Sequence, residues 1–341
     1  MIQIKTWLKA LRTIPRVTEE EWKSYDIISK WLIATRSAVF ILTALSALIG
    51  GLLAFRDGPV NWWYFTVALL GLIFAHAANN LINDLVDYNK GIDKDNYYRS
   101  QYGPQPLQHG LMTKPVFYGY VVVTLTLAIA AGVYLILNTG PLTLYLAIAG
   151  LLFLLFYTWP LKYIGLGEPT VLLVWGPLMI GGVYYVSGGS TWSWEAVMIG
   201  LIYAIGPTSV LFGKHTDKLE EDKKKGVYTL PVIIGEKAAR YANIGLWALQ
   251  FILLLAMVFT RQLTFAMLIV FLAVPKFTWA TKIYSKPRPS SEPEDLEKNV
   301  WPLYLSAHAF VYNRRFGGLF LLGLIADIIL TRLGFDFTVM L

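Results

Sequence analysis

The segment NNLINDLVDYNKGID, residues 79–93, places amide and carboxylate side chains at the end of an apolar stretch. Asn83, Asp84 and Asp87 follow Asn80 by three, four and seven residues, so a helix would present all four on one face. Carboxylates at this position repel one another and lie at the negative end of the helix dipole. Mg²⁺ prefers oxygen ligands and is commonly held by one or two carboxylates plus phosphates. We therefore predict a Mg²⁺ site on this face.

A glycine follows this face and could turn the chain back toward it. Gly91 stands where a helix often ends in a left-handed residue. The turn would carry Asp93 and Asp95 toward the carboxylates, so Asp93 is expected as a further metal ligand. Lys90, within the same D-x-x-K-G pattern, is a candidate contact for phosphate oxygens.

A second charged segment, KHTDKLEEDKKKGVYTLP at residues 214–231, repeats the D-x-x-K-G pattern. Its acids could hold metal while its lysines neutralise phosphate oxygens, so the two segments together could bind a diphosphate. The expected metal ligands are Asp217, Glu221 and Asp222, and Lys214 and His215 are candidate contacts for diphosphate or acceptor. The alternative is that these charges only anchor helix ends at lipid headgroups.

The elements that carry both segments are predicted to be transmembrane helices. The chain of 341 residues is 56% hydrophobic and 15% charged, with a mean hydropathy of +0.52, as is typical of membrane proteins. Runs of about 20 apolar residues indicate spans. Nine are expected, at 32–54, 62–82, 116–138, 142–159, 169–187, 195–213, 243–260, 264–283 and 317–338. The expected organisation is an amphipathic segment, 1–31, and a nine-helix domain, 32–341.

The net charge of +7 is distributed in a way that argues against nucleic-acid binding. Most Lys and Arg residues precede the first span or follow the second, fourth, sixth and eighth. This positive-inside pattern predicts a cytoplasmic N-terminus, a C-terminus on the opposite side and acidic segments that face the cytoplasm. Residues 2–14 alternate apolar and basic side chains, which indicates an interfacial amphipathic helix or, alternatively, a flexible basic leader.

Two classes of feature are not expected from this sequence. No short apolar region with a cleavage site opens the chain, so no signal peptide is predicted. Cysteine is absent, which excludes a disulfide framework, thiolate catalysis and Cys-ligated metal.

The two acidic segments resemble the motifs of the UbiA superfamily of intramembrane prenyltransferases. The first motif, N-D-x-x-D with a further Asp downstream, is matched by Asn83, Asp84, Asp87 and Asp93. The second is matched by Asp222, Gly226, Thr229, Leu230 and Pro231. Between them, residues 157–186 are similar to the branch that prenylates 1,4-dihydroxy-2-naphthoate in menaquinone synthesis. This likeness is carried by Tyr157, Lys162, Gly167, Glu168, Gly176, Pro177, Tyr184 and Tyr185.

The sequence departs from the family pattern at two positions. Gly91 stands where the first motif has an Asp, a departure that the naphthoate branch accommodates with the Asp two places on, here Asp93. Lys218 stands where the second motif has an acid four residues before Asp222. Asp217 or Glu221 could substitute for that acid, or the lysines could replace one metal ion.

The resemblance implies an all-α bundle of nine helices around a cavity open to the membrane. It implies Mg²⁺-assisted departure of diphosphate from a polyprenyl diphosphate and capture of the allylic cation by an aromatic acceptor. Asp84, Asp87, Asp217 and Asp222 would be catalytic. Arg99 and Lys162 resemble the family's cations beside the diphosphate, and Arg36 joins them as a charge within the first predicted span. The candidates for the acceptor and prenyl cavity are Asn80, Tyr157, Tyr163, Tyr184 and His215.

Other functions stay open at this point. On the same scaffold they include a carotenoid elongase, an ether-lipid or chlorophyll-type prenyltransferase, and a terpene cyclase in which the cation is captured internally. A transporter is a different class, since polar residues in helical bundles often mark ion pathways. Transporter sites tend to lie near the bilayer midplane, whereas these acids are at helix ends beside lysines. The expected partners are a polyprenyl diphosphate, an aromatic acceptor and the lipid bilayer.

Overall fold

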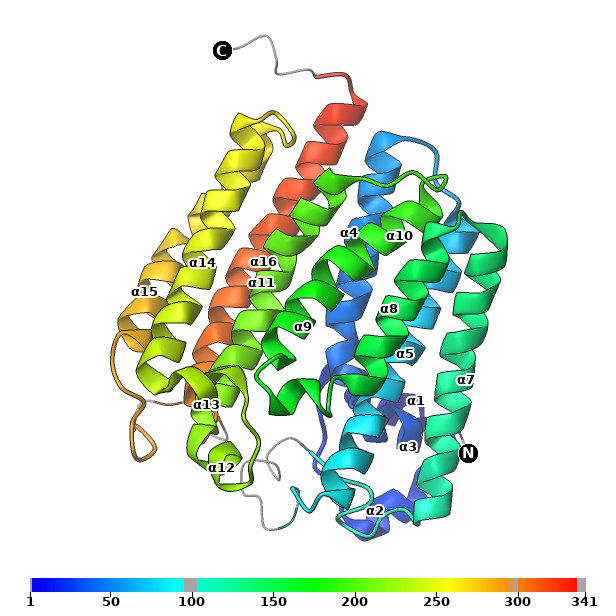
Figure 1. The fold of residues 1–341 in the computed structure, drawn as a ribbon, viewed down its shortest axis with the longest axis vertical. Helices are drawn as coiled ribbons and strands as arrows, with labels where there is room; N and C mark the ends of the chain where they lie inside the picture. The colour runs from blue at the N-terminus through cyan, green and yellow to red at the C-terminus, as the bar shows by residue number, and fades with distance from the viewer. Residues whose placement is uncertain (1, 93, 95–102, 295, 297–299, 336–341) are drawn as a thin grey trace. The chain divides into compact units, whose positions relative to one another are not determined.

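The computed structural model describes residues 2–92, 94, 103–294, 296 and 300–335 (Figure 1). Across these residues the secondary structure is helical, with no strand assigned. A single β-bridge pairs Ile164 with Tyr228 within the same part of the chain. The all-α class expected from the apolar runs is therefore confirmed.

The chain divides into two compact units, and α4 contributes to both. Unit 1 comprises residues 1–47 and 62–160, and unit 2 comprises residues 48–61 and 161–341. The helices of unit 1 are α1 (Ile4–Arg12), α2 (Glu19–Ser24), α3 (Ile27–Ala34), η1 (Ser37–Val39), the first part of α4 (Phe40–Asp57), α5 (Trp62–Asn89), α7 (Lys114–Asn138) and α8 (Leu142–Phe156).

Unit 2 is built around α11 (Trp194–Asp217) and α16 (Tyr304–Arg332), which pack against each other. Its other helices are the end of α4, η2 (Leu161–Tyr163), α9 (Gly167–Leu173), η3 (Val174–Leu178), α10 (Met179–Ser187), α12 (Leu219–Lys224), α13 (Leu230–Ile234), α14 (Glu236–Phe259), η4 (Phe265–Ala273) and α15 (Val274–Tyr284). Close approach requires glycine where η3 meets α11, because a Cβ on Gly176 would lie 2.7 Å from the carbonyl oxygen of Gly200.

Seven helical stretches of the described chain are long and apolar enough to cross a membrane. They are Ser37–Asp57, Trp62–Asn89, Lys114–Asn138, Gly167–Ser187, Trp194–Asp217, Glu236–Phe259 and Phe265–Tyr284. The expected count of nine is not confirmed. Helix α8 has only 15 residues, and α16 carries Arg314, Arg315 and Asp327 within its 29 residues.

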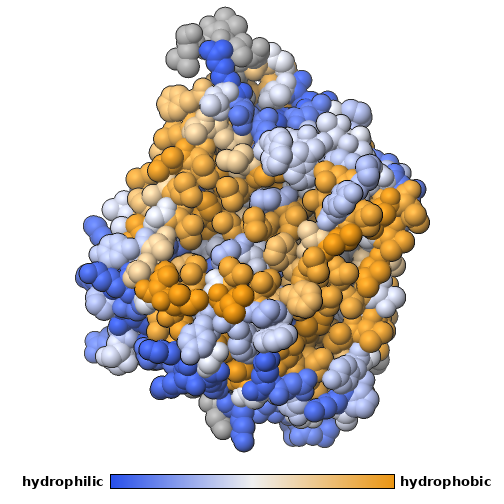
Figure 2. Space-filling model, viewed as in Figure 1, coloured by the Kyte–Doolittle hydropathy of each residue, from blue (hydrophilic) through white to orange (hydrophobic). Residues whose placement is uncertain are grey.

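The outer surfaces of these helices are apolar, as a bilayer requires. On α7, Val122, Val123 and Leu137 are 60%, 61% and 78% exposed. In water such a concentration of exposed apolar side chains would be unfavourable. Figure 2 shows the apolar surface in orange and the polar residues in blue. The protein is therefore an integral membrane protein.

The first span begins later than the sequence indicates. Helix α3 ends at Ala34, and Arg36 adopts a left-handed conformation with φ of 56° before η1 starts at Ser37. A left-handed residue interrupts the helical hydrogen bonds, so the run predicted at 32–54 is two helices separated by a break. Arg36 consequently lies at this break and not inside the span.

Candidate active site

The first acidic segment forms the end of α5. Because α5 is continuous from Trp62 to Asn89, Asp84 and Asp87 lie one turn apart on the same face, and they are only 3% and 5% exposed. Arg36 reaches this face from the break before η1. Its Nη2 donates to Asp84 Oδ1 at 2.5 Å and to the carbonyl oxygen of Asn80 at 3.1 Å.

Three asparagines on α5 are fixed through their amide nitrogens. Asn79 Nδ2 donates to the carbonyl of Leu154 at 3.0 Å, and Asn80 Nδ2 donates to the carbonyl of Thr35 at 2.7 Å. Asn83 Nδ2 donates to Thr158 Oγ1 at 3.1 Å. An amide has one donor side and one acceptor side. With the nitrogens anchored, the oxygens of Asn80 and Asn83 are left to act as acceptors or ligands.

The chain leaves α5 by the left-handed turn that the sequence predicts. Gly91 has φ of 68°, and the backbone N–H of Ile92 donates to the carbonyl of Asp87 at 2.9 Å. Exposed Lys90 lies over the ring of Trp159, with 5.0 Å between Nζ and the ring centroid. The other expected residues of this loop, Asp93, Asp95 and Arg99, lie outside the described residues.

The second D-x-x-K-G copy makes the same turn in unit 2. Gly226 has φ of 69°, and the N–H of Val227 donates to the carbonyl of Asp222 at 2.8 Å. The repeat seen in the sequence therefore corresponds to a repeated helix ending. In both copies the turn places the motif aspartate in the last turns of a helix.

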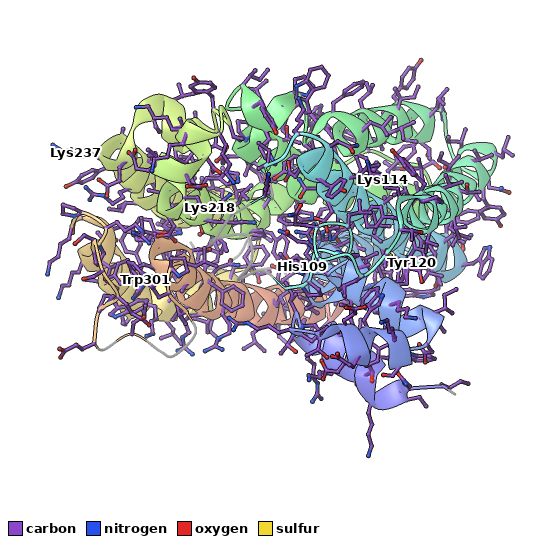
Figure 3. The ribbon with its side chains drawn as sticks, turned by 90° about the horizontal axis from the view of Figure 1, so that it is seen from below. His109, Lys114, Tyr120, Lys218, Lys237 and Trp301 are labelled. Carbon is purple, nitrogen blue, oxygen red and sulfur yellow. The ribbon has the colours of Figure 1, made fainter. Side chains whose placement is uncertain are left out.

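The acids of the second copy are paired with lysines of the same segment. Lys218 Nζ lies 2.9 Å from Asp222 Oδ1, and Lys225 Nζ lies 3.4 Å from Glu221 Oε1. Asp222 is 3% exposed, and its Oδ2 has no hydrogen-bond partner within the described chain. Figure 3 labels Lys218 at the end of α11. Each of these carboxylates thus already has a cation beside it.

Asp217 is held by the backbone that starts α16. Its carboxylate accepts hydrogen bonds from the N–H groups of Leu305 and Ser306, both at 2.9 Å, and from Arg288 Nε at 3.0 Å. The side chain is fully buried. Arg288 belongs to the loop between α15 and α16 and reaches this motif residue from there. These contacts connect residues 71 to 89 positions apart, which local patterns do not reveal.

A buried pair beside the second copy was not recognised as a site from the sequence. Glu168 Oε1 lies 2.6 Å from His215 Nδ1, and these residues are 1% and 4% exposed. Glu168 Oε2 has no hydrogen-bond partner among the residues described. The bridge between Ile164 and Tyr228 brings the loop before α9 to the loop after Gly226. The sequence signal that could have identified this site is the acidic residue Glu168 within the segment GLGEP, residues 165–169.

Within unit 2, the predicted cavity aromatic Tyr184 lies away from the second acidic segment. Tyr184 donates its hydroxyl to Asp57 Oδ2 at 2.8 Å, and Asp57 is joined through Arg56 to Glu195. Glu195 begins α11, whereas Asp217 ends it, about 33 Å away at 1.5 Å per residue. The structure therefore places the Tyr184 hydroxyl at the end of unit 2 opposite the acidic segment.

The remaining expected residues lie nearer to the motifs within their own units. Tyr157 ends α8 in unit 1, next to the Thr158 that anchors an α5 asparagine. In unit 2, Lys162 Nζ lies 5.6 Å from the ring centroid of Tyr163, and Lys162 Cα would lie 3.5 Å from a Cβ on Gly167, which precedes Glu168. Lys214 is in the last turn of α11, one residue before His215.

The donor set of the first motif fits a magnesium ion that is also bound by phosphate. Within the described residues, no group of three or more His, Asp or Glu is placed to hold a metal alone. Asp84 and Asp87 supply two carboxylates on one face, and Asn83, one residue before Asp84, adds an amide oxygen. Mg²⁺ commonly takes one or two carboxylates and completes its shell with water and phosphate oxygens.

The whole chain was compared with models of known protein families. A model described as the UbiA prenyltransferase family matches residues 43–301. The chain belongs to this family. Both acidic segments fall within the matched residues.

Two curated relatives illustrate the range within the UbiA family. The UbiA prenyltransferase domain-containing protein 1 of Xenopus tropicalis is 26% identical over 211 residues, which are 60% of this chain and 59% of that protein. The 1,4-dihydroxy-2-naphthoate octaprenyltransferase of Bacillus subtilis is 24% identical over 251 residues, which are 73% of this chain and 79% of that protein. The chain thus spans less than two thirds of the length of the Xenopus relative.

Solved structures of UbiA proteins share the fold. A structure of a digeranylgeranylglyceryl phosphate synthase aligns with a TM-score of 0.59 at 20% identity, covering 88% of this chain and 97% of that one. A UbiA homologue from Archaeoglobus fulgidus, bound to GPP and Mg²⁺, aligns with a TM-score of 0.53 at 18% identity, covering 85% and 99%. At these identities the likeness establishes the fold.

Proposed function

We propose that this UbiA protein transfers a prenyl group from a polyprenyl diphosphate to 1,4-dihydroxy-2-naphthoate. In this reaction the bond between C1 of the prenyl group and the diphosphate oxygen breaks, and its electron pair leaves with the diphosphate. A new bond then joins C1 to the acceptor ring, and the ring carboxylate leaves as CO₂, so that the charge balances and the ring stays aromatic. The observation that carries the proposal is the buried pair Asp84 and Asp87, with Arg36 positioned on the same face of α5.

The first motif is suited to hold a diphosphate through a divalent cation. Bound at Asp84 and Asp87, Mg²⁺ would neutralise charge that develops on the leaving diphosphate. Arg36 orients Asp84 through the contact of 2.5 Å, and Asn83 is held by Thr158 with its oxygen available. The A. fulgidus homologue, which binds GPP and Mg²⁺, supports this use of a shared fold.

In the second motif we propose that lysine takes the place of a metal ion. Lys218 stands where the family pattern has an acid, and its ammonium group contacts Asp222 Oδ1 directly. Asp217 already accepts hydrogen bonds from Arg288 and from the backbone at the start of α16, so we propose that it does not replace the missing acid as a metal ligand. Lys218 and Lys225 would then neutralise phosphate oxygens as fixed charges.

The choice of acceptor rests on sequence likeness. Residues 157–186 resemble the naphthoate branch, and the B. subtilis relative is named for the same acceptor. Glu168 lies within this stretch and pairs with His215 of the second charged segment, where a buried imidazole could hydrogen-bond an acceptor hydroxyl. A different acceptor on the same scaffold, or internal capture of the cation, is the alternative.

Product analysis separates these possibilities. The purified protein is incubated with geranylgeranyl or longer polyprenyl diphosphates, with and without 1,4-dihydroxy-2-naphthoate, in Mg²⁺ or EDTA. A prenylated, decarboxylated naphthol that forms only with Mg²⁺ is the expected product. An acceptor-independent hydrocarbon would identify a cyclase, and intact diphosphate under every condition would overturn the proposal.

The metal-binding role of Asp87 is tested by substitution. Asp87→Ala should abolish turnover because it removes one of two carboxylates from the first motif, while the folded state is retained. Activity is measured by diphosphate release, and folding is checked by circular dichroism and by elution from size-exclusion chromatography. Full activity in a folded Asp87→Ala protein would contradict the assignment.

A further inference from the structure

Helix α1 carries two exposed stripes of different chemistry. The apolar stripe, formed by Ile4, Leu8 and Leu11, is 60%, 54% and 46% exposed. The basic stripe, formed by Lys5, Lys9 and Arg12, is also exposed. Within each stripe the residues follow at intervals of four and three, so each runs along one side of the helix. The members of the two stripes differ by one residue, so the stripes lie about 100° apart around the helix.

A third side of α1 packs on the protein. Ala10 is 2% exposed, and its carbonyl accepts a hydrogen bond from Ser37 Oγ at 3.0 Å. Trp7 Nε1 donates to Asp26 Oδ1 at 3.1 Å, and the N–H of Gln3 donates to Asp26 Oδ2 at 2.8 Å. The apolar stripe is therefore not the side that the core of unit 1 covers. In Figure 3 the blue N-terminal helices lie at the edge of unit 1, with side chains projecting away from it.

Asp26, whose carboxylate is hydrogen-bonded to Gln3 and to Trp7 of α1, is ionised at physiological pH. Desolvation of Asp26 opposes its ionisation, but hydrogen bonds from the backbone of Ser29, the indole of Trp7 and the backbone of Gln3 lower its pKa to about 2. The hydrogen bonds that Asp26 accepts from Gln3 and Trp7 are therefore weakened by protonation only in strong acid. Helix α1 is thus fixed to unit 1 independently of its two exposed stripes.

The position of α1 along the membrane normal follows from the contact with Ser37. Ser37 is the first residue of the first membrane-spanning stretch, so a helix bonded to it lies where that stretch enters the bilayer. At this depth apolar side chains meet acyl chains and cations meet lipid phosphates. The basic stripe has the charge that attracts an anionic leaflet.

We propose that α1 is an interfacial anchor, with its apolar stripe inserted into the bilayer and its basic stripe bound to anionic lipid headgroups. The anchor also supports the active site, a part of the inference that rests on the proposed function. Ser37 is bonded to α1 and immediately follows Arg36, whose left-handed backbone directs its guanidinium to Asp84. Lipid bound along α1 therefore stabilises the break that positions Arg36.

The depth of α1 is measured by spin labelling, for which a chain without cysteine is well suited. Nitroxide labels are attached to Leu8→Cys, to Lys9→Cys and, as a control on exposed α2, to Glu20→Cys. The proteins are reconstituted in vesicles of phosphatidylcholine, with or without phosphatidylglycerol. The label at position 8 should collide more with oxygen and less with a water-soluble nickel complex than the label at position 20. Equal nickel accessibility at positions 8 and 20 would overturn the anchor.

Lipid dependence tests the basic stripe. The combined variant Lys5→Gln, Lys9→Gln and Arg12→Gln is compared with the charge-matched control Lys237→Gln, Lys282→Gln and Lys286→Gln. Phosphatidylglycerol should lower the KM for prenyl diphosphate severalfold in wild type and control, but not in the basic-stripe variant. An unchanged lipid response in that variant would overturn headgroup binding. If no variant turns over substrate, the proposed function fails, while the labelling experiment still decides the anchor.

Discussion

At the scale of single residues, each motif pairs a buried carboxylate with a cation from the protein, and the two pairings arise differently. Arg36 reaches Asp84 from 48 positions away because its left-handed backbone turns it out of the helical path. Lys218 reaches Asp222 from the preceding turn of the chain, four residues away. A buried carboxylate without a partner is strongly unfavourable, and in each motif the cation supplies that partner and orients the aspartate.

Removal of Arg36 should destabilise the protein and increase its response to magnesium. Arg36→Gln leaves Asp84 buried without its cation, which is expected to lower the free energy of unfolding by about 3 kcal/mol. A divalent cation at Asp84 would restore part of that loss. Melting temperatures in detergent, measured against Mg²⁺ concentration, should therefore rise more steeply for Arg36→Gln than for wild type.

An exposed ion pair provides the control for this measurement. Lys23 and Glu19 on α2 are 73% and 64% exposed, and such pairs contribute at most about 1 kcal/mol. Lys23→Gln should therefore change neither the melting temperature nor its magnesium response appreciably. Equal magnesium responses in Arg36→Gln and Lys23→Gln would contradict a cation site at Asp84.

Replacement of Lys218 by an acid should create metal-binding capacity in the second motif. Lys218→Asp removes the internal cation from Asp222 and adds a carboxylate one turn away, so the pair could share a divalent ion. The number of Mn²⁺ ions bound per chain, measured by electron paramagnetic resonance, should increase over wild type. Lys225→Asp, which leaves the Lys218 contact intact, is the matched control. An unchanged count in Lys218→Asp would show that lysine does not stand in for a metal.

At the scale of elements, α11 organises unit 2 and carries the second motif at its end. It packs against α9, η3, α14 and α16, and it joins the buried Arg56 cluster at one end to Asp217 at the other. The contact with η3 is a backbone approach between Gly176 and Gly200. The registration of α11 against η3, and with it the position of His215 beside Glu168, depends on both residues lacking a side chain.

A side chain at the η3 contact should therefore disturb the site from a distance. In Gly176→Val the new Cβ would lie 2.7 Å from the Gly200 oxygen, so the helices must separate. Overpacking of this kind costs about 1–3 kcal/mol. We expect a lower melting temperature together with reduced turnover. Gly245→Val on α14, where a Cβ meets open space, is the control and should leave both quantities near wild type.

At the scale of the whole molecule, the positive-inside pattern predicts which membrane side each loop faces, and this topology stays a prediction. Single cysteines at exposed Glu220, beside the second motif, and at exposed Gln262, between α14 and η4, would test it. In inside-out vesicles an impermeant maleimide should label Glu220→Cys, whereas in right-side-out vesicles it should label Gln262→Cys. Labelling of both positions from one side would refute the predicted orientation.

The sequence by itself determined the class of the protein and the local form of its motifs. Apolar runs can be recognised without a structure because a helix in lipid must satisfy its own hydrogen bonds over a known length. The period of a helix places Asp84 and Asp87 on one face. Gly91 and Gly226 indicate the left-handed turns in which the two motif helices end. These features depend on residues within a few positions of one another.

Tertiary structure decided what the polar side chains contact. Nothing near Arg36 in the sequence signals a left-handed break, because neither glycine nor proline stands there. Asp217 has the same local pattern as a metal ligand, yet it binds backbone groups 88 and 89 positions away. Glu168 likewise finds His215 across 47 positions. Such pairs form because a charge buried by packing must be neutralised by whichever group the fold brings within reach, and that neighbour is not encoded locally.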